Sequence, residues 1–115
     1  MQPIMRGEIY YAALDNSIGS EQAGQRPVLI VQADPLNQNS PTAIIAPITS
    51  VLKNPFMQSH CILPISCPLR ERSMVLAEQI RAIDRRRLGA YVGPLKSADM
   101  HEVEQALKYC LGLER

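Results

Sequence analysis

Helical periodicity is confined to the end of this 115-residue chain. Ser97 is a suitable N-cap, and beyond it apolar side chains recur at the spacing of one helix face. These side chains are Met100, Val103, Leu107, Cys110 and Leu111. The earlier segments are short, rich in apolar residues and separated by proline, glycine and asparagine, which is typical of strands joined by turns. The sequence therefore predicts a mainly β fold, a small curled sheet or barrel, with one C-terminal helix packed on it.

The strands are predicted from apolar segments that end at turn-forming residues. The segment Pro27–Gln32 is apolar on both faces, which favours a central strand. Pro47 lacks an N–H group, so the end of its strand should lie on an edge or at a bulge. The stretch Asp34–Pro41 holds several breakers and is expected to be a loop. The expected strands are Glu8–Ala13, Pro27–Gln32, Thr42–Thr49, His60–Ile65, Ser73–Arg81 and a short one around Tyr91.

Composition narrows the class of protein. The length suits one domain spanning residues 1–115, and a net charge of +1 excludes a general polycation that coats nucleic acid. Three cysteines without a C-x-x-C pair argue against a disulfide framework and a zinc site, and fit a reducing cytoplasm. Acidic residues are scattered, and no signal peptide or membrane-spanning apolar run is recognised. A cytoplasmic protein without metal, cofactor or membrane contact is expected.

A glycine-bracketed polar loop, residues 19–25, leads to Arg26 at the start of the second strand. Gln25 and Arg26 stand where a phosphate-binding loop requires lysine and a hydroxyl residue, so that motif is rejected. If the second and third strands pair antiparallel, Arg26 lies beside Thr49, which ends the third strand. A guanidinium fork next to a hydroxyl suits a phosphate. The alternative is that Arg26 forms an ion pair with Glu21 and that Thr49 merely ends a strand.

Other residues are candidates for contacts with nucleic-acid bases. The expected fifth strand begins apolar and ends polar, which places Glu78, Gln79 and Arg81 at the rim of the sheet. Amide and carboxylate groups there can read base edges, or the segment is simply a solvated strand end. Phe56 and Met57 lie in a loop and could stack on a base, or they could pack back onto the core.

An ordered set of short segments runs through nearly the whole chain: Arg6–Tyr10, Gly19–Gln22, Arg26–Leu29, Ile48–Thr49, Glu78–Arg81, Ile83–Asp84 and Arg87–Leu88. In these segments the chain resembles the MazF/PemK family of toxins of bacterial type II toxin–antitoxin systems. This resemblance implies a fold like an SH3 barrel with a terminal helix, the PemK/CcdB-like fold, and a homodimer. It also implies a metal-independent endoribonuclease, an mRNA interferase, that cuts single-stranded RNA at a short sequence.

By this resemblance Arg26 and Thr49 take the catalytic positions. Residues 20–22 belong to a loop that closes on RNA, with Ser20 and Gln22 as RNA contacts. Glu78 and Gln79 line the base-reading surface, and Pro47, Phe56, Met57 and Arg81 complete the expected RNA-binding set. Segment 53–71 matches the family poorly, and loops there are expected to tune the cut sequence.

The chemistry of metal-free RNA cleavage fits this assignment. The ribose 2′-OH attacks the adjacent phosphorus, and Arg26 and Thr49 stabilise the negative charge that develops. Glu21 is the candidate base, because a guanidinium is a poor one. The expected products are a 2′,3′-cyclic phosphate and a 5′-hydroxyl. The same basic cleft would accept the acidic C-terminal segment of an antitoxin.

Two other functions remain open from the sequence. A toxin family of the same fold, CcdB, acts by binding DNA gyrase, and its activity depends on a C-terminal Trp-Gly-Ile. This chain contains no tryptophan, which argues against that function. A non-catalytic barrel that only binds RNA or protein is the third possibility, and the presence of both Arg26 and Thr49 argues against it.

Overall fold

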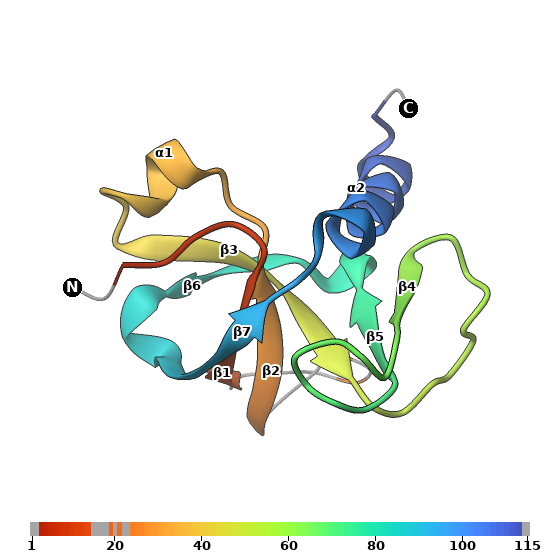
Figure 1. Ribbon diagram of the computed structural model, residues 1–115. Coiled ribbons are helices and arrows are strands. Elements are labelled where there is room, and N and C mark those ends of the chain that lie inside the picture. The colour runs from red at the N-terminus through yellow and green to blue at the C-terminus, as the bar shows by residue number, and fades with distance from the viewer. Residues whose placement is uncertain (1–2, 15–18, 20, 22–23, 114–115) are drawn as a thin grey trace.

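A curled antiparallel sheet carries one long helix on its side (Figure 1). The computed structural model describes residues 3–14, 19, 21 and 24–113. Within them the chain forms seven strands, two α-helices and two 3₁₀ turns. The elements in chain order are β1 Glu8–Leu14, β2 Gly24–Ile30, α1 Asp34–Asn37, β3 Thr42–Thr49, β4 His60–Leu63, β5 Ser73–Leu76, η1 Ala77–Gln79, β6 Arg81–Asp84, η2 Arg85–Arg87, β7 Leu88–Pro94 and α2 Ser97–Leu111.

The strand order is β4-β5-β3-β2-β1-β7, with β6 also paired to β3. The expectation that the second strand is central is confirmed, since β2 lies between β1 and β3. In the described part of the chain β4 and β7 end this path and do not pair with each other. The sheet is therefore barrel-like without being closed, and the expected mainly β fold with a C-terminal helix is confirmed.

Pro47 lies inside the sheet rather than on its outer edge. On one side β3 pairs with β2, where Pro47 is opposite Val28. On the other side of β3 the partner strand changes. Its pairing with β6 ends at Ile45, and its pairing with β5 begins at Ile48. A residue without an N–H donor is tolerated at such an interruption of the ladder. The expected edge position is therefore wrong, and a change of partner strand stands where a bulge was the other expectation.

The sheet has an apolar core on each face. Successive residues of a strand point to opposite faces, so Leu29 joins one core while Val28 and Ile30 join the other. The first core is closed by α2, whose Val103 is fully buried. The second is closed by the N-terminal segment and by β6, through Ile83. This double burial explains why β2 is apolar on both faces.

Several boundaries differ from the sequence-based expectation. The expected strand Ser73–Arg81 is two strands, β5 and β6, separated by η1, so Glu78 and Gln79 lie in a 3₁₀ turn. The expected loop Asp34–Pro41 contains the short helix α1, which has a proline at its start, where the missing N–H costs nothing. Lys96, and not Ser97, is the N-cap of α2, and no side chain caps it.

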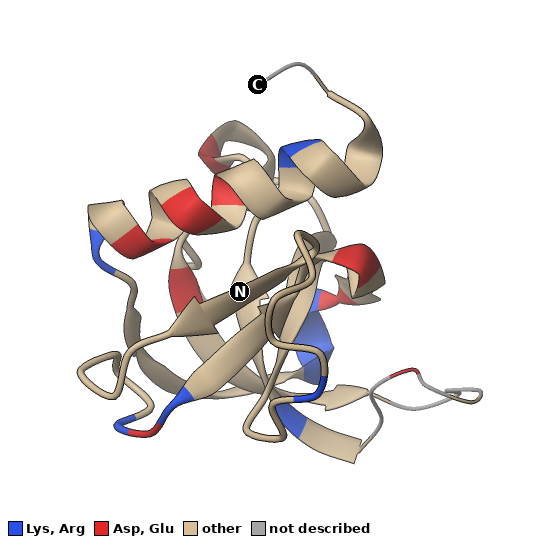
Figure 2. Cartoon of the chain, turned by 90° about the vertical axis from the view of Figure 1, so that its right-hand side faces the viewer, with Lys and Arg blue, Asp and Glu red and all other residues tan. Residues whose placement is uncertain are grey.

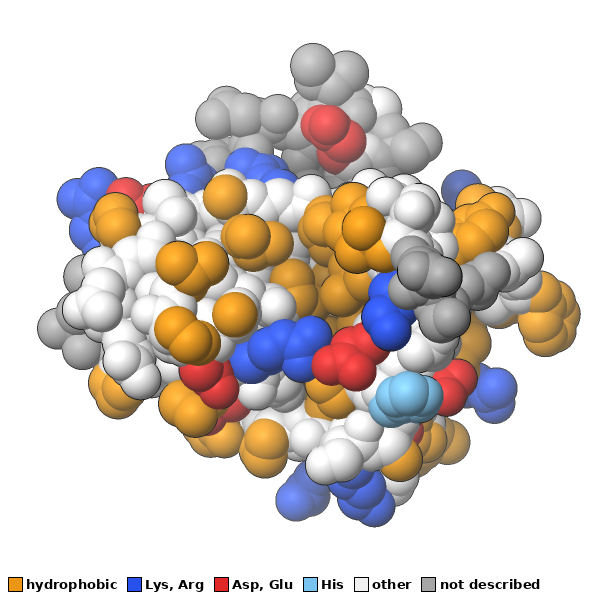
Figure 3. All heavy atoms as spheres, turned by 90° about the horizontal axis from the view of Figure 1, so that it is seen from above, with side chains coloured by type: hydrophobic (Ala, Val, Ile, Leu, Met, Phe, Trp, Pro, Cys, Tyr) orange, Lys and Arg blue, Asp and Glu red, His pale blue; other side chains and the backbone are white. Residues whose placement is uncertain are grey.

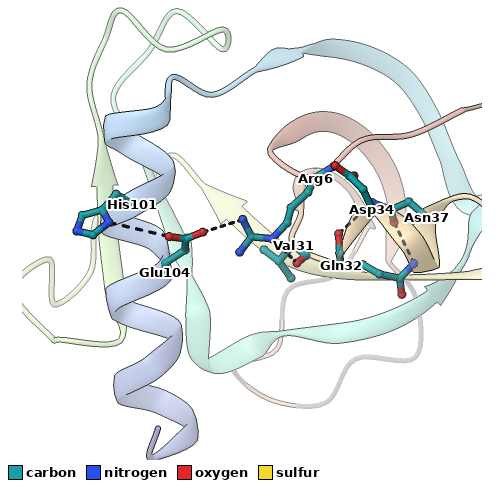
Figure 4. Close-up of polar contacts among 7 residues, drawn as sticks. All are labelled: Arg6, Val31, Gln32, Asp34, Asn37, His101 and Glu104. Atoms are coloured by element: carbon teal, nitrogen blue, oxygen red, sulfur yellow. Dashed lines mark hydrogen bonds and ion pairs between the residues drawn. The ribbon is translucent and has the colours of Figure 1, made fainter. Parts of the chain in front are cut away.

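Polar contacts tie the N-terminal segment to α2 (Figure 4). The Arg6 Nη1 donates to Glu104 Oε2 at 2.7 Å, and its Nε donates to the Val31 carbonyl at 3.1 Å. The Arg6 backbone N–H donates to Asp34 Oδ1 at 2.7 Å. Arg6 thus links the start of the chain, the end of β2 and α2, elements that are far apart in sequence.

Candidate functional site

The register of β2 and β3 places Arg26 and Thr49 at the same end of the sheet. Val28 is opposite Pro47 and Ile30 is opposite Ile45, so the antiparallel pairing expected from the sequence is confirmed. Arg26 and Thr49 each lie two residues beyond the last of these pairs, Val28 and Pro47. Both residues line a cleft of about 490 Å³. Arg26 lies inside β2 rather than at its start, because the strand begins at Gly24.

Thr49 is almost fully buried, and its hydroxyl oxygen has a backbone partner. The Val51 backbone N–H donates to Thr49 Oγ1 at 3.1 Å. An oxygen that accepts one hydrogen bond can still donate its own hydrogen. Thr49 can therefore still donate a hydrogen bond into the cleft, while the exposed Arg26 contributes a cation.

The cleft also brings together residues from the loop before β4 and from β4, β5 and η1. Of the side chains expected to contact RNA, Met57, Glu78 and Gln79 line it. Arg26 and Lys53 contribute positive charge, and Glu78 contributes negative charge. A phosphate and a base edge could thus be bound side by side. The remaining lining residues are Val51, Asn54, His60, Met74 and Leu76.

The other expected site residues lie outside the cleft lining. Phe56 is 97% exposed, so it is displayed to solvent rather than packed onto the core. Pro47 is buried, and Arg81 lies on β6 opposite Ile45. Glu21 lies at the surface. Ser20 and Gln22 lie outside the described residues, so their expected RNA contacts stay predictions.

His60 is a cleft residue that sequence reasoning missed. Its side chain is only 6% exposed, and its Nε2 lies 2.8 Å from Glu78 Oε2. Its Nδ1 lies 2.9 Å from the Asn54 carbonyl oxygen. A lone histidine whose glutamate partner lies 18 residues further along the chain forms no recognisable sequence motif. Its position at a strand start, shortly after a loop, was the only available signal.

Cys61 follows His60 in β4 but is not a nucleophile. Burial, reinforced by the negative charges of Glu102 and Asp99, raises the pKa of the Cys61 thiol to about 11. A thiol with so high a pKa stays protonated at neutral pH and unreactive. Among the described residues, no group of three or more His, Cys, Asp or Glu side chains is arranged to hold a metal ion.

Charge is unevenly distributed over the molecule. Acidic residues gather along α2, as Figure 2 shows: Asp99, Glu102 and Glu104. On the face seen in Figure 3, described side chains of both signs alternate in a row, without a broad area of one sign. On that face a phosphate would therefore meet individual cations rather than a uniformly basic surface.

Residues 5–111 match the model of one family, described as the PemK-like, MazF-like toxin of type II toxin–antitoxin systems. The chain belongs to this family. It is 40% identical over 111 residues to endoribonuclease EndoA of Bacillus subtilis (strain 168), and the match covers 96% of each chain. The family expected from the sequence is thereby confirmed.

Solved structures with the same fold include MazF from Deinococcus radiodurans. It has a TM-score of 0.84 and 24% identity, with coverage of 98% of this chain and 100% of that one. An endoribonuclease from a mycobacterial species, in complex with its cognate antitoxin, has a TM-score of 0.80 and 25% identity over 97% of this chain and 98% of its own. These likenesses confirm the fold. Among the described helices, none is long and apolar enough to cross a membrane.

Proposed function

We propose that this toxin-family protein is a sequence-specific, metal-independent endoribonuclease, an mRNA interferase that cleaves single-stranded RNA. The main observation behind the proposal is that Arg26 and Thr49, on the neighbouring antiparallel strands β2 and β3, line the same cleft. The proposal is supported by the 40% identity to a protein named as an endoribonuclease. Arg26, Thr49 and Glu21 are the proposed catalytic residues.

In the proposed reaction the 2′-oxygen of one ribose forms a bond to the adjacent phosphorus, and the bond from phosphorus to the 5′-oxygen breaks. Negative charge develops on the phosphoryl oxygens. Two parallel hydrogen bonds from the Arg26 guanidinium neutralise this charge, and the Thr49 hydroxyl donates one more. The products are a 2′,3′-cyclic phosphate and a 5′-hydroxyl, because no water attacks phosphorus.

Two protons move in this reaction. The 2′-OH proton passes to a base, for which Glu21 is the proposed residue. The leaving 5′-oxygen takes up a proton, and Arg26 is the proposed donor. A guanidinium retains its proton to about pH 12 or above, so charge stabilisation is the main role proposed for Arg26.

Single-stranded RNA suits this site because its bases can be splayed out and read on their edges. Met57 and Gln79 line the cleft near Glu78, where a base next to the cut phosphate would lie. Phe56 supplies an exposed ring on which a further base can stack. The remaining proposed RNA contacts are Ser20, Gln22, Pro47 and Arg81.

A cognate antitoxin is the proposed inhibitor. A related mycobacterial endoribonuclease has been solved with its cognate antitoxin, and a Deinococcus radiodurans MazF with MazE. We propose that an acidic C-terminal segment of the antitoxin covers the Arg26 end of the cleft and competes with RNA. A complex that leaves this end open would contradict the proposal.

We further propose one domain over residues 1–115, a homodimer and a cytoplasmic location.

The test is RNA cleavage in excess EDTA with the ends of every fragment mapped. We expect discrete cuts with 5′-hydroxyl and cyclic-phosphate ends, and loss of cleavage in Arg26→Ala. Arg86→Ala is the matched control, because Arg86 is 90% exposed and its Nη2 pairs with Asp84 Oδ2 at 2.9 Å, outside the cleft lining. Fragments with 5′-phosphate ends, or cleavage that stops in EDTA, would contradict the proposed chemistry.

The same experiment separates the other candidate functions. A folded protein that leaves RNA intact would favour a gyrase-binding toxin or a non-catalytic barrel. Inhibition of gyrase that survives Arg26→Ala would then identify the former.

A further inference from the structure

His60 connects the two walls of the cleft. One wall is the turn that begins at Asn54 and displays Phe56 and Met57, and the other is η1 with Glu78. The ring of His60 contacts both, through Nδ1 to the Asn54 carbonyl and through Nε2 to Glu78. Both side chains line the cleft; that of His60 is only 6% exposed, whereas that of Glu78 is 37% exposed.

The turn beside His60 is held by several hydrogen bonds. Asn54 has a positive φ of 52°, and its carbonyl accepts from the Met57 backbone N–H at 3.2 Å as well as from the His60 ring. The His60 backbone N–H in turn donates to the Met57 carbonyl at 2.9 Å. The half-exposed Met57 and the exposed Phe56 are therefore presented by a turn that His60 closes at two points.

The hydrogen-bond partners of His60 determine which of its ring atoms must donate. A carbonyl oxygen only accepts, so Nδ1 must carry a hydrogen. Nε2 faces a carboxylate oxygen, which also only accepts. The His60–Glu78 contact therefore requires one additional proton, on Nε2. If that proton is removed, two acceptors face each other at 2.8 Å and the contact is no longer favourable.

The charges around His60 come from several elements. Glu78 lies on η1, Lys53 in the segment before β4, and Arg26 on β2, all lining the same cleft. On its other side His60 lines a smaller groove with Glu102 of α2. His60 thus lines both the cleft of the proposed chemistry and a groove that reaches α2.

We infer that His60 is a positioning residue for RNA recognition. Its ring holds the Glu78 side chain and the Asn54–Met57 turn in fixed positions relative to each other. This inference rests on the proposed function and deepens it. In it Glu78 touches the RNA base, and His60 acts only through Glu78 and the turn. Replacement of His60 should weaken RNA binding while leaving the chemical step at Arg26 and Thr49 intact.

Two near-isosteric variants separate the two contacts. In His60→Gln the amide nitrogen lies near the position of Nε2 and can still donate to Glu78. In His60→Asn it lies near Nδ1 and can donate only to the Asn54 carbonyl. His101→Gln is the control, since His101 is an exposed residue outside the cleft.

The probe is an oligonucleotide that carries the mapped cut sequence. We expect His60→Asn to raise KM about tenfold or more, with kcat within about twofold of wild type, because a charge-assisted hydrogen bond to Glu78 is removed. His60→Gln should stay within about threefold of wild type in both constants. An equal rise in KM in both variants, or no rise in either, would overturn the inference.

A second measurement needs neither cleavage nor a variant at His60. Long-range ¹H–¹⁵N spectra of the RNA-free protein, assigned with His101→Gln, report which ring nitrogen carries hydrogen. Nε2 of His60 should carry a hydrogen, which it donates to Glu78, and a ring whose only hydrogen is on Nδ1 would overturn the contact. If wild-type protein fails to cut RNA while Nε2 carries this hydrogen, the proposed function fails and the His60 geometry stands.

Discussion

At the scale of residues, the Thr49 hydroxyl has a specific expected contribution. Replacing Thr49 by valine removes the donor with little change in volume, and the cleavage rate should fall by about 10²–10³-fold. Thr49→Ser keeps the hydroxyl that accepts from the Val51 N–H and should retain most activity. Single-turnover cleavage measures both variants, with thermal melting as the check on folding. A Thr49→Val protein as fast as wild type would remove Thr49 from the mechanism.

The proximity of Arg26 and Thr49 could be predicted from the sequence, because pairing two adjacent antiparallel strands determines which of their ends meet. The contact between His60 and Glu78 could not. It depends on η1, the 3₁₀ turn that interrupts what reads as one continuous strand, and on a loop between β3 and β4 without periodicity. Alternation along a strand gives no guide to side chains in such a turn.

At the scale of elements, α1 and the N-terminal segment are joined by the carboxyl group of Asp34. Hydrogen bonds from the Arg6 backbone N–H and then from the Asn37 amide hold the pKa of Asp34 below its usual range. A lowered folded-state pKa gives stability above about pH 4, which is lost as pH falls through the folded-state value. The stability difference between wild type and Asp34→Asn should therefore be constant from about pH 5 to 7 and shrink at lower pH. Urea unfolding at each pH measures it, and a pH-independent difference would contradict the assignment.

Packing of α2 on the sheet depends on its buried face. Val103 is fully buried, so Val103→Ala should lower the free energy of unfolding by about 2 kcal/mol, from reduced apolar burial and the cavity left behind. His101→Ala, on the exposed face, should change it by less than about 0.5 kcal/mol. Denaturant unfolding measures both, and similar values for the two variants would show that α2 contributes little to the core.

The helix itself was predictable because its apolar stripe repeats over its whole length. The 3₁₀ turns and α1 were not, because four residues or fewer show no period. Pro35 looked like a breaker, although a proline at the start of a helix favours it.

At the scale of the whole molecule, a net charge of +1 leaves RNA binding dependent on the cleft. The affinity for an uncleavable RNA, with 2′-deoxyribose at the cut position, should fall as salt concentration rises. Arg26→Ala should reduce the slope of log affinity against log salt by about 0.7 for each phosphate that Arg26 neutralises, and Arg86→Ala should leave it unchanged. Fluorescence anisotropy gives both slopes. An equal effect of the two variants would indicate a diffuse electrostatic surface instead of a cleft.

The most direct measurement of where RNA binds is the change in backbone amide chemical shifts when the uncleavable RNA is added. We expect the largest changes at the start of β2, at the end of β3, in residues 51–57 and in η1, the segments that surround Arg26 and Thr49. Small changes there, with large ones confined to α1, β7 or the acidic face of α2, would contradict the assignment of this cleft as the RNA site.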